Sequence, residues 1–163
     1  MVIACSDHSR SCFDSFDADR LVWLQGAASL VAGGAAMATI EYAIELKAVA
    51  DIVLCSHVDC TSLGHILSAE EAQLPAAWKG IAGPLQTSIA TRYGQLSTQE
   101  QAPVIAAEHV LNQVEELTRQ PRVQRALNED RLRIHAWVHS EETGSLRVYD
   151  PSSGHFSEAT LEA

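Results

Sequence analysis

Two short, uninterrupted apolar segments on either side of a helical segment constrain the fold of this chain more than any other feature. Residues 2–5 are Val-Ile-Ala-Cys and residues 52–55 are Ile-Val-Leu-Cys, and polar residues follow each of them. Between them, residues 35–49 place apolar side chains along one side, as an amphipathic helix does. Strands without polar alternation are typical of parallel sheets that are buried on both faces. The pattern therefore predicts a strand–helix–strand unit of an α/β protein.

The middle of the chain continues this alternation of strands and helices. A second short strand is expected at residues 21–24, and a mostly helical region, interrupted by prolines, at residues 68–94. Pro103 fits an N-terminal position, which predicts a long helix over residues 103–119. Pro121 starts a shorter helix that ends near Asn128.

The C-terminal part carries a β-hairpin pattern. Apolar and polar side chains alternate over residues 132–138, a Glu-Thr-Gly turn follows, and Leu146 and Val148 continue the alternation in a last strand. We therefore predict one domain over residues 1–163. Its fold class is α/β, with a mainly parallel central sheet flanked by helices and an antiparallel C-terminal edge strand.

Charge and composition exclude several classes of partner. The chain has 21 acidic and 11 basic residues and a net charge of −10, so nothing would offset repulsion from nucleic acid or an anionic membrane. No apolar run reaches the ~20 residues that span a bilayer. No secretory signal is visible at the N-terminus, and the four cysteines are too sparse for a disulfide scaffold. We expect a cytoplasmic protein with reduced thiols.

Three side chains of this sequence form a candidate metal site. Cys5 ends the first predicted strand, and His57 and Cys60 lie three residues apart just after the third. Neighbouring parallel strands end at the same edge of a sheet, where ligands of α/β proteins collect. Two thiolates and one imidazole suit zinc and leave a fourth position free. Spacing alone leaves an alternative open, in which both cysteines are small buried residues and His57 is a core histidine.

Longer motifs around these residues resemble those of the β-class carbonic anhydrases. That family carries C-x-D-x-R after its first strand and H-x-x-C after its third. Here the segments are Cys-Ser-Asp-His-Ser-Arg over residues 5–10 and His-Val-Asp-Cys over residues 57–60. Residues 133–138, Arg-Ile-His-Ala-Trp-Val, and residues 143–146, Thr-Gly-Ser-Leu, resemble the family's L-H-G-W-x-Y…T-G-x-L hairpin. The resemblance covers nearly the whole chain in the right order and implies a β-carbonic anhydrase-like fold.

The resemblance also implies a function and a set of site residues. Cys5, His57 and Cys60 would be the ligands of one Zn²⁺ ion, and the substrates would be CO2 and bicarbonate. Asp7 would accept a hydrogen bond from the water on zinc, or ligate zinc directly in a closed form. Arg10 would pair with Asp7 and hold it away from the metal. Asp7 and Arg10 are therefore the expected catalytic residues.

Four departures from the family pattern bear on this expectation. Arg10 follows Asp7 by three residues instead of two, so the pair is either bridged by a swing of Arg10 or lost. Thr61 and Ser62 replace a glycine after the last cysteine and would crowd the pocket. Residues 25–29 lack the arginine and asparagines of the family's R-N-x-(G/A)-N segment. The family's N-terminal helices, which embrace the partner subunit, are absent.

Several alternatives therefore stay open. A zinc-binding pseudoenzyme or structural subunit of the same fold is the first, and a carbonyl sulfide or carbon disulfide hydrolase is the second. A redox protein that uses Cys5 and Cys60 is a distant third. We also expect a homodimer or larger oligomer, because the flank of the first strand and the Gly/Ala-rich residues 26–38 would otherwise stay uncovered.

The other histidines and cysteines have weaker roles in this interpretation. His8 would be a proton shuttle, an accidental fourth ligand or a loop histidine without a role. His65 and His109 are expected in helices and receive no chemistry. Cys12 and Cys55 are expected to be structural.

Overall fold

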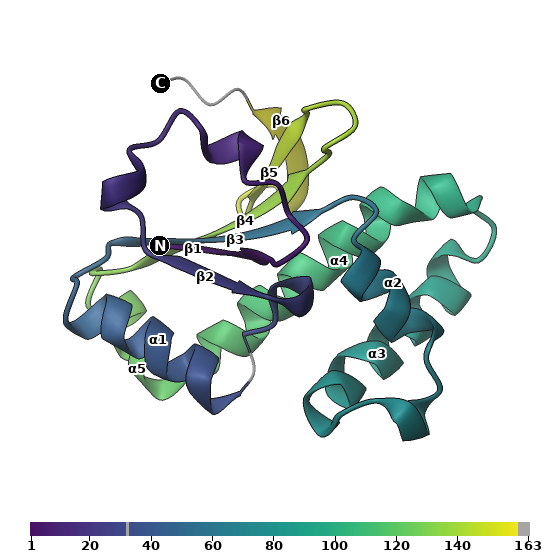
Figure 1. The fold of residues 1–163 in the computed structure, drawn as a ribbon, viewed down its shortest axis with the longest axis horizontal. Coiled ribbons are helices and arrows are strands. Elements are labelled where there is room, and N and C mark those ends of the chain that lie inside the picture. The colour runs from purple at the N-terminus through teal and green to yellow at the C-terminus, as the bar shows by residue number, and fades with distance from the viewer. Residues whose placement is uncertain (32, 160–163) are drawn as a thin grey trace.

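A computed structural model of the chain, which describes residues 1–31 and 33–159, contains a mixed sheet with helices around it (Figure 1). The six strands are β1 (Val2–Cys5), β2 (Trp23–Gly26), β3 (Asp51–His57), β4 (Arg133–His139), β5 (Leu146–Asp150) and β6 (His155–Ala159). The five α-helices are α1 (Gly34–Glu45), α2 (Thr61–Ser68), α3 (Ala76–Ser88), α4 (Thr98–Thr118) and α5 (Pro121–Asn128). A π-helical turn over Ile89–Tyr93 directly follows α3.

The strand order places the first and third strands side by side inside the sheet, with β2 at the edge next to β1. The order is β2-β1-β3-β4-β5-β6, with parallel pairing from β2 through β4 and antiparallel pairing from β4 through β6. Ala4 lies opposite Cys55, so the carboxyl ends of β1 and β3 meet at one edge. This topology confirms the predicted α/β fold class and brings the two expected metal-binding segments together.

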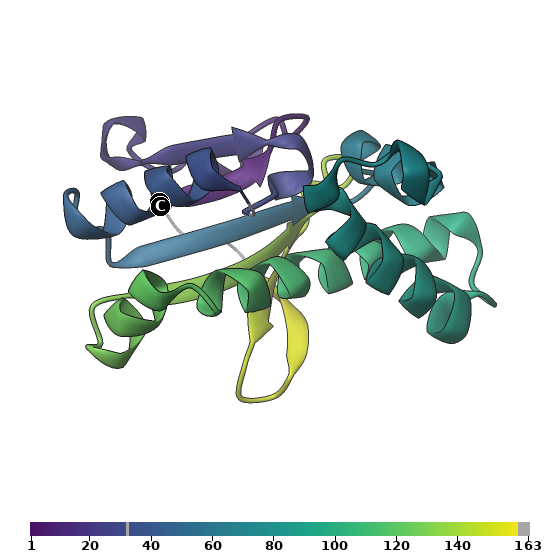
Figure 2. The ribbon, with the colours of Figure 1, turned by 90° about the horizontal axis from the view of Figure 1, so that it is seen from below.

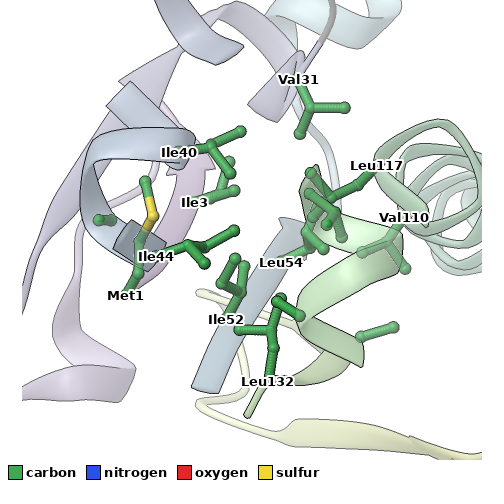
Figure 3. Packing of buried hydrophobic residues seen from close by; sticks show 14 of the residues in the cluster. Met1, Ile3, Val31, Ile40, Ile44, Ile52, Leu54, Val110, Leu117 and Leu132 are labelled. Carbon is green, nitrogen blue, oxygen red and sulfur yellow. The ribbon is translucent and has the colours of Figure 1, made fainter. Parts of the chain in front are cut away.

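One face of the sheet is covered by three helices, α1, α4 and α5 (Figure 2). Side chains from β1, β3 and β4 that point to this face pack against these helices and form the largest core cluster; it includes Ile3, Ile40, Ile44, Ile52, Leu54, Val110 and Leu117 (Figure 3). α2 and α3 lie beyond the carboxyl edge of the sheet, next to the first half of α4 (Figures 1 and 2). In the described part of the chain, no helix combines the length and the apolar character that crossing a bilayer requires.

The opposite face of the sheet carries an aromatic cluster from the segment that follows β1. Phe13 stacks on Trp137 of β4 with ring centroids 5.4 Å apart, and Trp23 of β2 meets Phe13 edge-on at 5.2 Å. Phe16 lies at the margin of this cluster with 40% of its surface exposed. The segment between β1 and β2, which forms two short 3₁₀ turns instead of an α-helix, thus covers part of this face with aromatic side chains.

Several element boundaries differ from the predicted ones. β2 begins two residues later than predicted, and α1 ends at Glu45 rather than at residue 49. α4 begins at Thr98, because Ser97 and Glu100 form a reciprocal capping box that starts the helix before Pro103. The predicted last strand, which contains Leu146 and Val148, is β5, and the structure adds a further strand, β6, after it. Its sequence, His-Phe-Ser-Glu-Ala, carries little apolar signal because it is an edge strand with mostly exposed side chains.

An ion pair at the start of β3 provides a test of pH-dependent stability. Arg133 of β4 holds both carboxylate oxygens of Asp51 at 2.8 Å, and His135 Nε2 lies 2.8 Å from one of them. The hydrogen bonds from Arg133, followed by the one from His135, lower the pKa of Asp51 to about 2. Because this pKa is lower in the folded than in the unfolded chain, the pair stabilises the fold above about pH 4 and loses its effect as the pH falls towards 2.

We therefore expect Asp51→Asn to lower the free energy of unfolding at pH 7 by up to ~1 kcal/mol, a modest value because the carboxylate is 41% exposed. Urea unfolding of the metal-free protein at pH 7 and pH 3 measures the difference, which should shrink at the lower pH. Asp130→Asn is the matched control, since Asp130 is exposed and makes no ion pair with any residue of the described ranges. An equal loss in both variants would contradict the prediction.

Candidate metal centre

The structure brings Cys5, His57 and Cys60 together at the carboxyl edge of the sheet. Cys5 is the last residue of β1, His57 the last residue of β3, and Cys60 the N-cap residue of α2. The two Sγ atoms lie 3.6 Å apart, close to the separation of two ligands on one zinc ion. All three side chains are buried.

Backbone N–H groups surround the two sulfur atoms. Cys5 Sγ accepts from the N–H of Ala28 at 3.1 Å and of Asp7 at 3.5 Å, and Cys60 Sγ accepts from Leu63 N–H at 3.4 Å. The hydrogen bond from Cys60, followed by the nearby His57 imidazole and the N–H groups of Asp7 and Ala28, lowers the pKa of Cys5 to about 3. The same hydrogen bond to Cys5 raises the pKa of Cys60. The metal-free pair thus consists of a Cys5 thiolate and a Cys60 thiol that donates to it.

His57 has a buried ring nitrogen without a partner. Its Nε2 makes no hydrogen bond to any described residue, although a buried polar atom normally has a partner. Burial is the largest single influence and lowers the pKa of His57, but the nearby Cys5 thiolate raises the pKa by more than burial lowers it, so the net shift is upward. An orphaned imidazole nitrogen beside two sulfur atoms is the donor set that zinc requires, so these residues fit a zinc ion.

Asp7 lies within reach of the same centre and is held there by Ser62. One carboxylate oxygen of Asp7 accepts from Ser62 Oγ at 2.7 Å and from Ser62 N–H at 3.0 Å. These hydrogen bonds keep the pKa of Asp7 below its ordinary value. The ligand atoms of Cys5, Asp7, His57 and Cys60 all lie within 4.8 Å of one another. The carboxylate can therefore serve as a fourth ligand or as a hydrogen-bond acceptor next to the metal position.

Arg10 is not the partner of Asp7 in this structure. Its guanidinium donates to Gln25 Oε1 and lies 4.6 Å above the ring of Trp23, while its backbone has a left-handed φ of 65°. No ion pair joins it to Asp7 within the described residues. The expected pair is thus replaced by Asp7–Ser62, because the longer loop directs Arg10 towards β2. Ser62 does not merely crowd the pocket, as its sequence position suggested, but binds the carboxylate.

Comparison with known proteins identifies the family to which this chain belongs. The sequence model described as carbonic anhydrase matches residues 1–146. A carbonic anhydrase of Pseudomonas aeruginosa is 33% identical over 96% of this chain and 75% of its own length. The chain belongs to the β-class carbonic anhydrases. Carbonic anhydrase 1 of Escherichia coli O157:H7 is 31% identical over 76% of this chain and 57% of its own length.

Solved β-carbonic anhydrases share this fold. The β-carbonic anhydrase CcaA superimposes with a TM-score of 0.83 at 22% identity, covering 97% of this chain and 82% of that one. The β-carbonic anhydrase CafD of Aspergillus fumigatus gives a TM-score of 0.80 at 24% identity, over 91% of this chain and 87% of that one. These superpositions confirm the β-carbonic anhydrase-like architecture predicted from the motifs.

The loop after β2 supports the site in a way that sequence reasoning missed. Ala28 and Ser29 adopt left-handed φ angles of 51° and 56°, which turn the Ala28 N–H towards Cys5. His109 of α4, to which no role was assigned, holds this turn through a 2.6 Å hydrogen bond between its Nε2 and Ala28 O. Ser29 Oγ donates to the carbonyl of Cys55 at 3.1 Å. In this β-carbonic anhydrase, the loop therefore supports Cys5, a candidate metal ligand, although it lacks the family's arginine and asparagines.

A small cavity of about 150 Å³ opens beside the metal-ligand cluster, between α2 and α4. His57 and Cys60 border it together with mostly apolar side chains; these include Leu63, Leu67, Ala102 and Ile105. None of these apolar positions stands out in the sequence, because each belongs to the inner face of a helix. The cavity offers a small apolar molecule a place directly next to His57 and Cys60.

Proposed function

We propose that this protein is a zinc-dependent carbonic anhydrase that interconverts CO2 and bicarbonate. The observation that carries the proposal is the cluster of Cys5, His57 and Cys60, with an orphaned His57 nitrogen, next to a small apolar cavity. When bound, zinc supplies Lewis-acid chemistry that lowers the pKa of water to about 7, so that hydroxide is available at neutral pH.

The chain's own residues supply binding and orientation. The apolar side chains of the cavity suit CO2, which is small and has no net dipole. Asp7 is ionised at neutral pH and can only accept hydrogen bonds, so it orients the attacking water by accepting a hydrogen bond from it. Ser62 fixes the direction of that carboxylate through two hydrogen bonds.

Metal removal provides the direct test of this function. Stopped-flow CO2 hydration on metal-quantified protein should show substantial activity at about one zinc per chain. Chelation should remove that activity together with the metal, and re-addition of zinc should restore both. Carbonyl sulfide, assayed in parallel, should be a poorer substrate. Faster hydrolysis of carbonyl sulfide than hydration of CO2 would contradict the proposal and indicate a carbonyl sulfide hydrolase.

The position of Arg10 favours one rival, a zinc-binding pseudoenzyme of the same fold. If Arg10 is needed to hold Asp7 away from the metal, its hydrogen bonds to Gln25 leave the carboxylate free to occupy the fourth ligand position. Stoichiometric zinc without CO2 hydration at any pH would support this rival over the enzyme.

We further propose a homo-oligomer, a cytoplasmic location and one domain over residues 1–163. A hollow of about 300 Å³ on the aromatic face of the sheet, bordered by Phe13, Phe16 and Trp137, supports the oligomer because such apolar surface is normally covered. Tetrameric β-carbonic anhydrases of Sordaria macrospora share the fold, with a TM-score of 0.72. Sedimentation at micromolar concentration tests the assembly, and a compact monomer would contradict it.

A further inference from the structure

A second cluster of cysteine and histidine side chains lies next to the metal centre but shares no residue with it. It consists of His8, Cys12, Cys55 and His139. His8 Nε2 lies 3.1 Å from His139 Nδ1, 3.7 Å from Cys12 Sγ and 3.9 Å from Cys55 Sγ. Three of the four residues are buried, with exposed fractions of 4% for His8, 2% for His139 and 0% for Cys55.

The hydrogen bonds of His8 show which of its nitrogens carries the proton. Its Nδ1 accepts from the backbone N–H of Arg10 at 3.0 Å, so the neutral ring must carry its proton on Nε2. Nε2 therefore points an N–H into the cluster, towards His139 Nδ1 and the sulfur of Cys12. A metal ion would need this nitrogen to be unprotonated. The arrangement suits a stabilised thiolate better than a second metal ion.

Cys12 and Cys55 differ in their access to solvent. Cys12 is partly exposed and borders a cavity of about 600 Å³, whereas Cys55 lies within β3 with no exposed surface. The nearby Cys55 thiol, followed by the His8 imidazole, lowers the pKa of Cys12 to about 5. Cys12 is thus a partly exposed thiolate. Its sulfur and that of Cys55 both lie within 4 Å of His8 Nε2, and the two residues belong to one packed cluster, as the members of a redox-active cysteine pair do.

We propose that Cys12 is a site of oxidation by small hydroperoxides and that Cys55 resolves the oxidised product. The Cys12 thiolate attacks one oxygen of the hydroperoxide, the O–O bond breaks, and the alkoxide or hydroxide that leaves takes up a proton. Cys12 becomes a sulfenic acid. The Cys55 sulfur then attacks the Cys12 sulfur, an S–S bond forms, and the S–O oxygen leaves as water with the Cys55 proton. Two thiols and one hydroperoxide give one disulfide, one alcohol or water, and one further water.

The experiment exposes the zinc-loaded protein to hydrogen peroxide, stops the reaction with acid and alkylates the remaining thiols in denaturant. Mass spectrometry then counts thiols and locates cross-links. In the wild type we expect a disulfide between the tryptic peptides 11–20 and 48–79, with zinc retained at Cys5, His57 and Cys60. The variant Cys12→Ser should keep all its remaining thiols under the same exposure. The variant Cys55→Ala should accumulate a sulfenic acid at Cys12 that dimedone traps.

Three outcomes would overturn the proposal. One is a wild type that keeps Cys12 as a free thiol while peroxide is consumed elsewhere. Another is a disulfide between Cys5 and Cys60 with release of zinc, in which case the metal ligands are the sensitive thiols. The third is a second equivalent of zinc or cobalt that binds the wild type and not Cys12→Ser. Because none of these measurements uses CO2 hydration, their result is independent of the proposed enzymatic activity.

Discussion

Replacing Cys60 by serine should remove most of the bound zinc and lower the free energy of unfolding substantially. Cys60 lies 3.6 Å from Cys5 and completes the cluster of two thiols and one imidazole. Loss of one of three protein ligands should weaken zinc binding by at least ~100-fold, more than loss of an outer partner does. At saturating zinc this corresponds to about 2.7 kcal/mol of lost stabilisation, since metal that binds only the folded chain stabilises it by mass action.

Serine is a well-matched replacement because it separates ligation from helix capping. Cys60 is also the N-cap residue of α2 and accepts from Leu63 N–H, a role that a serine hydroxyl performs at least as well. The helix should therefore survive, and the loss should be specific to the metal. Elemental analysis and thermal unfolding with and without zinc measure it. Cys12→Ser is the control and should keep its zinc; full zinc in Cys60→Ser, or none in the wild type, would refute the site.

The second large effect concerns Asp7, whose carboxylate is proposed to orient the attacking water. Asp7→Asn should lower kcat for CO2 hydration by roughly 100-fold or more, because the amide no longer offers an acceptor-only pair of oxygens. Ser62→Ala removes the 2.7 Å hydroxyl hydrogen bond but keeps the backbone N–H at 3.0 Å. Since a hydrogen bond to a charged group contributes about 1.5–3 kcal/mol, we expect Ser62→Ala to lower kcat for CO2 hydration roughly tenfold or more.

Ser62→Thr should retain most of the activity, because it keeps the hydroxyl. Arg10→Ala is the informative comparison, since Arg10 contacts Gln25 and Trp23 and not Asp7. We expect it to change kcat by less than about threefold, in line with an exposed polar contact. If Arg10→Ala loses as much activity as Asp7→Asn while Ser62→Ala stays active, Arg10 performs the role that the family motif implies, and Ser62 does not.

The strand–helix–strand pattern of the N-terminal half was predictable because a strand that is buried on both faces needs apolar residues at every position. β1 and β3 lie within one or two residues of their predicted positions, and their carboxyl ends meet as the topology of parallel sheets requires. The edge strand β6 has no such apolar run, because most of its side chains face solvent and can be polar.

The sequence alone also predicted which three proposed metal ligands would meet at this edge of the sheet. Cys5, His57 and Cys60 have to follow two neighbouring strands to converge, and this requirement is local: a strand end and a short spacing. The fold class and the resemblance to β-carbonic anhydrases rest on the same local patterns, which the family comparison confirms.

Only the tertiary structure decided which side chain holds Asp7. One additional residue in the loop after β1 is enough to send Arg10 to Gln25 and to leave the carboxylate to Ser62, which is 55 residues away in the chain. His109 lies 81 residues from the Ala28 carbonyl that it holds. A hydrogen bond depends on a few tenths of an ångström and on direction, and neither is encoded in the spacing of residues that meet only after the sheet and α4 have packed.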